Sequence, residues 1–399
     1  MKISLRGEMM PQSPIRKLAD LADSAKKKGV EVFHLNIGQP DIETPAVFFK
    51  AIREFNDDVL SYGPSGGLAE LRSVIVDYFR NFNLVIDLDQ VWITTGGSEA
   101  IIFAMMSICD PGDEIIVVEP FYTNYNGFAV MAQVKLNPVT ARVEDGFRLP
   151  PKEKIIELIT GRTRAILISN PSNPTGTVYT EEEMYILSQI CKRHNLYLLS
   201  DEVYREFVYD GRRHISALSL PEIDDRVIIL DSISKRFSAC GARVGYIISR
   251  NKEFMTTVLK FAQARLCPPT LEQFGAIMAF KDYFSYIAPV VKRYKRRRDV
   301  LFDSLKEIPG VFGLKPEGAF YAVLKLPVED SEDFTAWLLT NFSLDGKTTM
   351  LAPARGFYAT PGMGKDEVRI AYVLKADRII EAIRVLKDAL RVYPRCTSS

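Results

Sequence analysis

Several features that would place a chain in a specialised class are scarce in this sequence. Its 399 residues hold only three histidines and five cysteines, with no C-x-x-C pair. The histidines, His34, His194 and His214, are too dispersed to suggest a metal site, so we expect no metal. The cysteines show no paired spacing, and a reduced cytoplasmic chain is the simplest expectation.

An excess of either charge is also missing. The chain has 51 basic and 50 acidic residues, so its overall charge gives no case for nucleic acid or an anionic membrane as a partner. No apolar run reaches the length of a membrane-spanning helix. The one dense basic run, residues 292–298, falls in a helix predicted to begin near Tyr286, and we expect a solvated helix face there.

The length and the apolar pattern indicate an α/β protein of at least two domains, because one core stops growing below this size. Between residues 45 and 280 apolar strand runs alternate with helical patterns, which favours a mostly parallel sheet covered on both faces. From residue 281 the pattern changes to a long charged helix, a strand at 318–324 and a helix at 378–392. No linker rich in proline, glycine or serine divides the two parts.

Lys235 lies in the segment SISKRFSACGARVGY, residues 232–246, eight positions before Arg243. A lysine amine can form a Schiff base with an aldehyde, and an arginine grips phosphate with a forked pair of donors. Taken alone, this segment is also compatible with a solvated lysine in a serine-rich loop.

Polar residues follow three predicted strands where each strand ends. The apolar run 165–168 stops at an Asn-Pro turn that leads to Asn173, and the run 196–199 leads to Asp201 and Tyr204. The run 227–230 leads toward Lys235. In open α/β sheets ligands bind beyond the carboxyl ends of the strands, so we expect these side chains to converge on one crevice.

The segment VWITTGGSEAIIFAMM, residues 91–106, reads as a short strand, a Gly96-Gly97-Ser98 turn and an apolar helix beginning near Glu99. Glycines allow close approach of the backbone, and the free N–H groups at a helix start attract anions. Serine and glycine are also ordinary helix caps, so the turn alone does not decide between the two interpretations.

Three motifs occur together: NPSNPTG at 170–176, SDEVY at 200–204 and SxSKxxxxxGxRxGY at 232–246. With them, the chain resembles the class I/II aminotransferases, fold type I pyridoxal phosphate enzymes that include the aspartate aminotransferases. The resemblance extends from about Leu35 to Tyr372. It implies a large cofactor-binding domain, residues 45–280, with a mostly parallel seven-stranded sheet that includes one antiparallel strand. It implies a smaller α/β domain from residues 1–44 and 281–399.

The resemblance also implies a catalytic set. Pyridoxal 5′-phosphate acts as an electron sink for the Cα of an amino acid. Lys235 would form the Schiff base and, once displaced, move the Cα proton. Asp201 would keep the ring nitrogen protonated, and Tyr204 and Asn173 would hydrogen-bond the ring's phenolic oxygen.

The cofactor's phosphate and ring have further matches in the family's pattern. The expected phosphate-binding residues are Gly97, Ser98, Ser232, Ser234 and Arg243. Tyr122 matches the aromatic residue that stacks on the ring, although Phe121 and Tyr125 compete for that place. Tyr62 matches a tyrosine that reaches the phosphate of the neighbouring subunit, which implies a homodimer with shared active sites.

Arg369 lies within an alternating apolar segment, residues 366–372, where an unpaired charge would be costly. By resemblance it binds the substrate's α-carboxylate, together with Asn173 and the backbone of Gly38. A structural pairing of Arg369 with Glu367 or Asp366 across an edge strand stays open.

The predicted function is an amino acid aminotransferase that passes an α-amino group from an L-amino acid to a 2-oxo acid such as 2-oxoglutarate, with aspartate and alanine as candidate donors. A β-eliminating lyase on the same scaffold is the alternative, and a non-catalytic sensor that binds the cofactor is a further one. A dicarboxylic substrate would need a second cation; Arg265 is the first candidate, with Arg16 and Arg355 behind it, and Arg265 could equally bind a phosphate or a structural acid.

Overall fold

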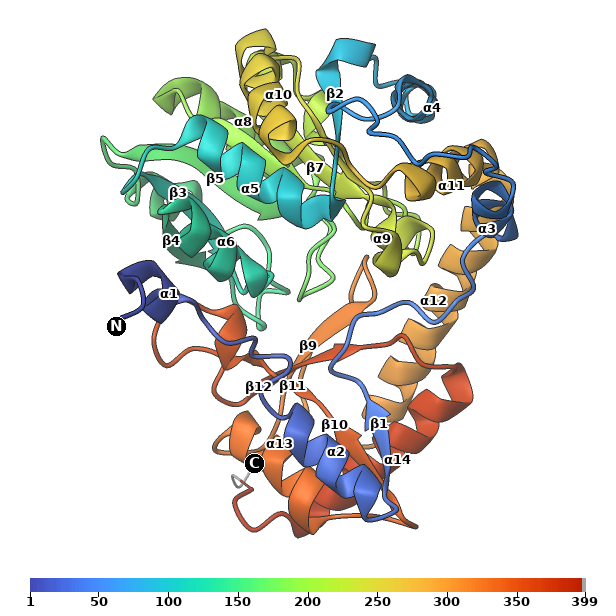
Figure 1. The fold of residues 1–399 in the computed structure, drawn as a ribbon. Helices are drawn as coiled ribbons and strands as arrows, with labels where there is room; N and C mark the ends of the chain where they lie inside the picture. The colour runs from blue at the N-terminus through green and yellow to red at the C-terminus, as the bar shows by residue number, and fades with distance from the viewer. Residues whose placement is uncertain (397–399) are drawn as a thin grey trace.

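The computed structural model describes residues 1–396 and arranges them in two lobes (Figure 1). The large lobe is built on a seven-stranded sheet with the order β2-β8-β7-β6-β5-β3-β4. Its strands are β2 (Val91–Thr94), β3 (Glu114–Glu119), β4 (Lys135–Thr140), β5 (Thr163–Ser169), β6 (Tyr197–Asp201), β7 (Val227–Ser232) and β8 (Gly245–Ile248). β8 is antiparallel to both of its neighbours, and the other pairs are parallel. The predicted sheet is therefore confirmed.

Helices cover both faces of this sheet, which explains its continuous apolar strands. Ala165 and Leu167 of β5 belong to the core under one set of helices, and Ile166 and Ile168 belong to the core on the opposite face. The first face carries α5 (Gly96–Ile108), α6 (Asn124–Ala132) and α10 (Lys252–Arg265). The second carries α3 (Ala46–Arg53), α4 (Ala69–Arg80), α7 (Lys152–Ile156), α8 (Glu181–His194) and α11 (Thr270–Lys281).

The small lobe lies below the large one in Figure 1 and has two small sheets. β1 (Glu31–His34) pairs in parallel with β10 (Lys347–Met350), and β12 (Glu367–Ala371) lies between β11 (Ala352–Pro353) and β9 (Tyr321–Lys325), antiparallel to both. The helices α2 (Ala19–Lys27), α13 (Ser331–Asn341) and α14 (Ala376–Val392) complete this lobe. β12 is a central strand, so Arg369 does not lie on a sheet edge.

The long helix α12 (Tyr283–Leu305) joins the lobes. Tyr283 and Ile287 pack in the core of the large lobe, whereas Tyr294 and Leu301 pack in the core of the small lobe. The helix begins three residues before the predicted start near Tyr286, with Asp282 as its first flanking residue.

The basic run on α12 is only partly a solvated face, so that prediction is wrong for two of its arginines. Arg297 and Arg298 are 7% and 0% exposed. Arg297 pairs with Asp41, and Arg298 pairs with Asp210 and donates to the carbonyl oxygen of Pro316. Arg298 also pairs with the adjacent Asp299, but Asp41 and Asp210 are distant in sequence, so the run itself does not reveal that Arg297 and Arg298 are buried.

The N-terminal segment contacts both lobes. The short helix α1 (Leu5–Met9) lies against α6 of the large lobe, and α2 packs on α13 of the small lobe. Residues 10–18 therefore pass from one lobe to the other.

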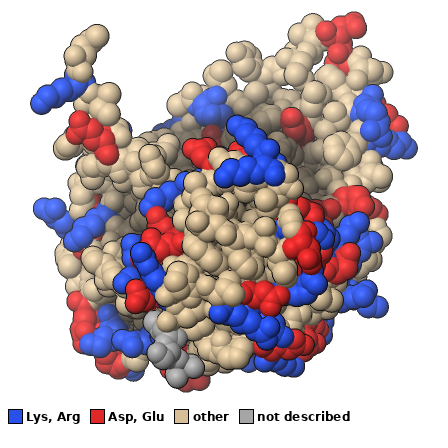
Figure 2. All heavy atoms as spheres, turned by 90° about the horizontal axis from the view of Figure 1, so that it is seen from below, with Lys and Arg blue, Asp and Glu red and all other residues tan. Residues whose placement is uncertain are grey.

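The outer surface is mixed in charge. On the face shown in Figure 2 basic and acidic side chains are interspersed, without an extended patch of one sign. Within residues 1–396 no helix is both long and apolar enough to span a membrane. The same residues contain no group of three or more histidine, cysteine and acidic side chains that could hold a metal ion.

Candidate active site

A cleft of about 510 Å³ opens where the carboxyl ends of the large lobe's strands face the small lobe. Both lobes and the N-terminal segment contribute to its walls. The lining residues that matter below are Arg16, Gly38, Gly97, Ser98, Tyr122, Asn173, Asp201, Tyr204, Ser232, Ser234, Lys235, Arg243, Tyr321 and Arg369. Except for Tyr62, every residue that the sequence predicts to bind the cofactor or the substrate's α-carboxylate lines this cleft.

Lys235 lies on α9 (Ile233–Arg236), a helix of four residues that directly follows β7. Its Nζ donates to the carbonyl oxygen of Gly38 at 2.9 Å and lies 3.7 Å from Cys240 Sγ. A helix this short has little stability of its own. The neighbouring Arg236 anchors it, because its guanidinium is fully buried and pairs at 2.7 Å with both Asp231 and Glu206.

Asp201 is the last residue of β6 and is buried. Tyr125 donates its hydroxyl proton to Asp201 Oδ2 at 2.7 Å, and the backbone N–H of Val203 approaches Oδ1 at 3.3 Å. Burial raises the pKa of the Asp201 carboxyl to about 6, against the lowering effect of these two hydrogen bonds. A buried carboxylate of this kind favours a cationic N–H group as its partner.

The first turn of α5 forms one end of the cleft. The helix begins at Gly96, three residues earlier than predicted, so Gly97 and Ser98 belong to the helix start itself. Glu99 accepts the backbone N–H of Thr95 at 2.7 Å and stabilises this earlier start. The unsatisfied N–H groups of such a turn suit an anion.

Close packing holds Arg243 beside this turn. A Cβ on Gly96 would lie 2.3 Å from Arg243 Nη2, so glycine is required for the guanidinium to approach. Arg243 Nη1 donates to the carbonyl oxygen of Cys240 at 3.0 Å. Ser232 and Ser234, at the start of α9, line the same end of the cleft. A cation, two hydroxyl groups and a helix start together fit a phosphate ester.

Arg369 extends from β12 into the cleft and is 1% exposed. It donates to Asn173 Oδ1 at 3.1 Å and to the carbonyl oxygen of Asn36, and its Nε has no partner among the described residues. Burial lowers the pKa of the guanidinium, which reflects the cost of a cation without an anion. The arrangement suits a carboxylate ligand.

The alternative pairing of Arg369 with its neighbours in sequence is wrong. Glu367 accepts the hydroxyl proton of Tyr358 at 2.6 Å, and Asp366 lies 3.5 Å from Lys325 Nζ. Successive residues of a strand point to opposite faces, so Glu367 shares a face with Arg369 but is directed to a different partner.

Aromatic residues form the middle of the cleft. Tyr122 lines it and accepts a hydrogen bond from Asn124 Nδ2 at 2.8 Å. Its competitors Phe121 and Tyr125 are buried and stacked on each other with ring centroids 6.1 Å apart. The Tyr204 hydroxyl lies 2.8 Å from that of Tyr321.

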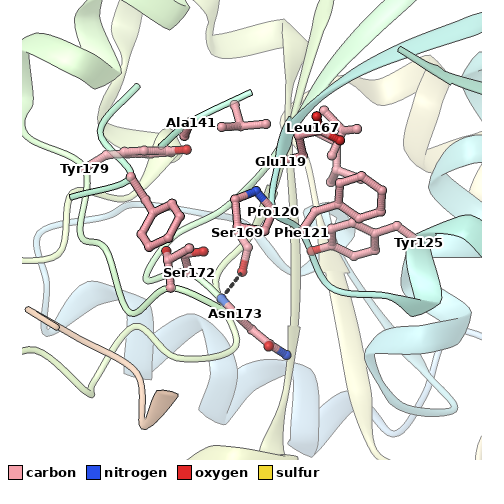
Figure 3. A pocket seen from close by; sticks show the side chains of 14 residues that line it. Glu119, Pro120, Phe121, Tyr125, Ala141, Leu167, Ser169, Ser172, Asn173 and Tyr179 are labelled. Atoms are coloured by element: carbon pink, nitrogen blue, oxygen red, sulfur yellow. Dashed lines mark hydrogen bonds between the residues drawn. The ribbon is translucent and has the colours of Figure 1, made fainter. Parts of the chain in front are cut away.

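Behind the cleft lies a second cavity of only about 10 Å³, too small for a substrate (Figure 3). Phe121, Tyr125 and Asn173 line it, and Asn173 also faces the main cleft. The backbone N–H of Asn173 approaches Ser169 Oγ at 3.4 Å. This wall fixes the loop that carries Asn173 beside Asp201.

Three of the four remaining candidates lie elsewhere. Tyr62 is 80% exposed and does not line the cleft of its own chain. Arg265 lies 3.4 Å from Glu99 and donates to backbone carbonyls, so a structural acid is its partner here. Arg355 pairs with Asp330 beside a separate cavity, whereas Arg16 lines the main cleft.

Two residues make contacts in the site that the sequence does not predict. The sequence predicts Tyr125 only as a competitor for stacking on the ring, yet it binds Asp201. It predicts Tyr321 only as part of a strand, yet Tyr321 contacts Tyr204 and lines the cleft. No local motif marks either role.

Comparison with known proteins agrees with this geometry. The profile of the family described as aminotransferase class I and II matches residues 30–389. An aspartate aminotransferase of Bacillus subtilis is 31% identical over 97% of this chain and 98% of its own. The solved aspartate aminotransferase of Thermotoga maritima has a TM-score of 0.89 at 33% identity, covering 98% of this chain and 100% of that one. The alanine aminotransferase of Pyrococcus furiosus also has a TM-score of 0.89, at 30% identity, covering 97% and 99%.

The chain belongs to the class I and II aminotransferase family. It is an enzyme, a transaminase of the fold type I architecture, in a family whose members use pyridoxal phosphate. The similar proteins differ in the amino acid of their names, so the family alone does not fix the substrate of this chain.

Proposed function

We propose that this aminotransferase holds pyridoxal 5′-phosphate in the cleft and moves an α-amino group from an L-amino acid to a 2-oxo acid such as 2-oxoglutarate. The observation that carries the proposal is the convergence of Lys235, Asp201 and Arg243 on one cleft. An amine, a buried carboxylate and a phosphate-binding cation there match the three reactive parts of the cofactor.

The cofactor, when bound, supplies an aldehyde and an electron-withdrawing ring for the substrate's Cα. Asp201 keeps a proton on the ring nitrogen. Lys235 holds the cofactor through its amine and, when released by the substrate, carries the proton from Cα. Tyr204 and Asn173 would donate to the ring's phenolic oxygen, and Tyr122 would stack on the ring.

Two anion sites orient the reactants. The cofactor's phosphate binds Gly97, Ser98, Ser232, Ser234 and Arg243. The substrate's α-carboxylate binds the guanidinium of Arg369, which donates to Asn173 in this structure. The backbone of Gly38 lies beside the same place. A carboxylate there would give the buried guanidinium the anion that it lacks.

For a dicarboxylic substrate, Arg16 is the proposed partner of the distal carboxylate. It lines the cleft and forms no ion pair with any described residue, unlike Arg265 and Arg355. Aspartate is then favoured over alanine as the donor. Lys17, the next residue, pairs with Glu332 and supplies a matched control.

Tyr62 is proposed to act on the neighbouring subunit of a homodimer, since it is exposed and absent from its own cleft.

The proposed domain limits are 45–280 for the large domain and 1–44 with 281–399 for the small one. No observation favours the β-eliminating alternative.

The test is a panel of amino donors with 2-oxoglutarate and pyruvate as acceptors. The wild-type protein should be yellow and should form more than one equivalent of 2-oxo acid per active site only when an acceptor is present. Lys235→Ala should abolish turnover, whereas a surface control, Lys260→Ala, should not. Continued turnover without an acceptor, beyond one equivalent of product per active site, would instead support elimination, and turnover by Lys235→Ala would contradict the proposal.

The distal-carboxylate assignment has its own measurement. Arg16→Gln should raise the KM for aspartate and 2-oxoglutarate about tenfold or more while leaving alanine nearly unaffected. Lys17→Gln should change neither. An equal effect of Arg16→Gln on all donors would remove Arg16 from this role.

A further inference from the structure

Tyr321 is the first residue of β9 and is 2% exposed, yet its side chain reaches the cleft. Its hydroxyl oxygen lies 2.8 Å from Tyr204 Oη and 3.4 Å from the carbonyl oxygen of Gly38. Lys235 Nζ donates to the same carbonyl oxygen at 2.9 Å. A single hydroxyl group therefore lies between Tyr204 and the backbone group that holds the reactive amine.

The surroundings fix the Tyr321 ring in this place. The Arg369 guanidinium lies 4.6 Å from the ring centroid. Tyr321 and Arg369 lie on the same face of their sheet, because Arg369 pairs with Val323 and side chains two residues apart share a face. A Cβ on Gly38 would lie 1.9 Å from the Tyr321 hydroxyl oxygen, so glycine allows the close approach.

The direction of the hydrogen bond follows from competition for acceptors. A tyrosine hydroxyl has one proton to donate and can accept one or two. The Gly38 carbonyl oxygen already accepts from Lys235. At 3.4 Å it is also too far from the Tyr321 hydroxyl oxygen for a strong hydrogen bond. Tyr204 Oη is the nearer acceptor, and when it accepts from Tyr321, its own proton is free to point into the cleft.

The Tyr204 hydroxyl keeps its own proton while this occurs. Burial raises the pKa of Tyr204 well above its usual range. Tyr204 is thus a neutral donor, and its effect on catalysis depends on which acceptor its hydroxyl proton faces.

We propose that Tyr321 is a positioning residue that donates to Tyr204 and so directs the Tyr204 proton toward the phenolic oxygen of the bound cofactor. This inference rests on the proposed function, because it needs the cofactor in the cleft. Tyr321 does not react itself; it sets the hydrogen bond through which Tyr204 tunes the cofactor.

The test compares Tyr321→Phe with Tyr372→Phe. Phenylalanine keeps the ring and removes one hydroxyl group. Tyr372 is also buried, and its hydroxyl donates to the carbonyl oxygen of Ala319 at 3.2 Å, outside the cleft lining. It controls for the general effect of deleting a buried hydroxyl.

Three quantities are measured for each variant: the pH midpoint of the bound cofactor's visible absorbance, kcat with KM, and the melting temperature. Tyr321→Phe should raise the midpoint by up to about one pH unit, because a donor to the phenolic oxygen stabilises its negative charge. It should lower kcat about threefold to tenfold with KM nearly unchanged. Tyr372→Phe should move only the melting temperature.

A double-mutant cycle with Tyr204→Phe identifies the path of the effect. If Tyr321 acts through Tyr204, removing its hydroxyl in the Tyr204→Phe background should no longer move the midpoint. Additive shifts would overturn the inference, as would a Tyr321→Phe variant with the midpoint and kcat of Tyr372→Phe. These results leave the proposed function intact, whereas a wild-type protein that neither binds the cofactor nor transaminates would overturn both.

Discussion

At the scale of single residues, the proposed role of Asp201 requires a buried carboxylate, which has a cost in the cofactor-free protein. Its carboxyl has a pKa of about 6 in the fold against an ordinary value of 3.8. The folded chain therefore binds this proton more tightly than the unfolded chain. The penalty is absent below about pH 4, grows between about pH 4 and pH 6, and is complete above that window.

Asp201→Asn should consequently stabilise the cofactor-free protein at pH 8 by up to about 3 kcal/mol and should have little effect near pH 4. The amide can still accept from Val203 and can donate to the Tyr125 oxygen. The same variant should lower kcat by at least about tenfold, because an amide does not hold a proton on the ring nitrogen. Melting curves at both pH values check the stability part, and a lower melting temperature at pH 8 would contradict it.

Arg369 shows the same opposition between function and stability. It is a buried cation bound to an amide and a carbonyl, with no acidic partner in the described chain. Arg369→Leu should leave the melting temperature unchanged or higher. It should reduce kcat/KM for amino acids by a factor that corresponds to about 2–5 kcal/mol of lost transition-state stabilisation, the cost of losing a desolvated charge pair.

Amines without a carboxylate give the control for Arg369, since they do not use this contact and should lose much less. A similar fractional loss for every donor, together with a lower melting temperature, would assign Arg369 a structural role.

Much of the candidate site could be predicted from the sequence, because its residues follow strand ends within three motifs. Tyr125 and Tyr321 could not. They contact Asp201 and Tyr204 across 76 and 117 residues of sequence. Their contributions depend on how α6 and β9 pack against β6 and the segment after it, which no local pattern encodes.

At the scale of elements, the contact between β8 and α5 shapes the proposed phosphate site. A Cβ on Gly245 would lie 2.4 Å from the carbonyl carbon of Gly96 and 2.6 Å from the backbone nitrogen of Gly97. Gly245→Ala should therefore displace the helix start, at a cost of about 1–3 kcal/mol for overpacking. Gly241→Ala, in the preceding 3-10 helix η4 (Cys240–Ala242), has open space around its Cβ and is the matched control.

The expected result is a Kd for pyridoxal 5′-phosphate at least about tenfold higher in Gly245→Ala, with no change for Gly241→Ala. Pyridoxal without the phosphate should bind both variants as it binds the wild type. An equal loss for the two ligands would mean that β8 and α5 affect the ring site rather than the phosphate site.

Element types were easier to predict than element starts. The strands and helices of the large lobe follow from the apolar pattern, but α5 begins before Glu99 because the Glu99 side chain binds the backbone of the preceding turn. The apolar pattern predicts Arg297 and Arg298 in solvent for a similar reason, since Asp41 and Asp210, which pair with them, lie outside α12.

At the scale of the whole molecule, Glu119 ties the two lobes together beside the cleft. It ends β3 and is fully buried. One carboxylate oxygen accepts the hydroxyl proton of Thr140 at 2.6 Å, and the other accepts the backbone N–H groups of Ala359 and Thr360 at 2.7 and 3.1 Å. The same segment of the small lobe places Phe357 under Arg369, 4.9 Å from its guanidinium.

Glu119→Ala should leave two backbone N–H groups and one hydroxyl group without an acceptor, at a cost of about 2–4 kcal/mol in the free energy of unfolding. Glu119→Gln should cost less than about 1.5 kcal/mol, because its amide oxygen can serve the two N–H groups while its NH₂ donates to Thr140. Since the contact joins the lobes below Arg369, Glu119→Ala should also raise the KM for every carboxylate substrate, while Glu119→Gln keeps it near the wild-type value. Denaturant unfolding and steady-state kinetics measure the two effects. Equal stability and equal KM in the two variants would show that the lobes keep their arrangement around the cleft without this carboxylate.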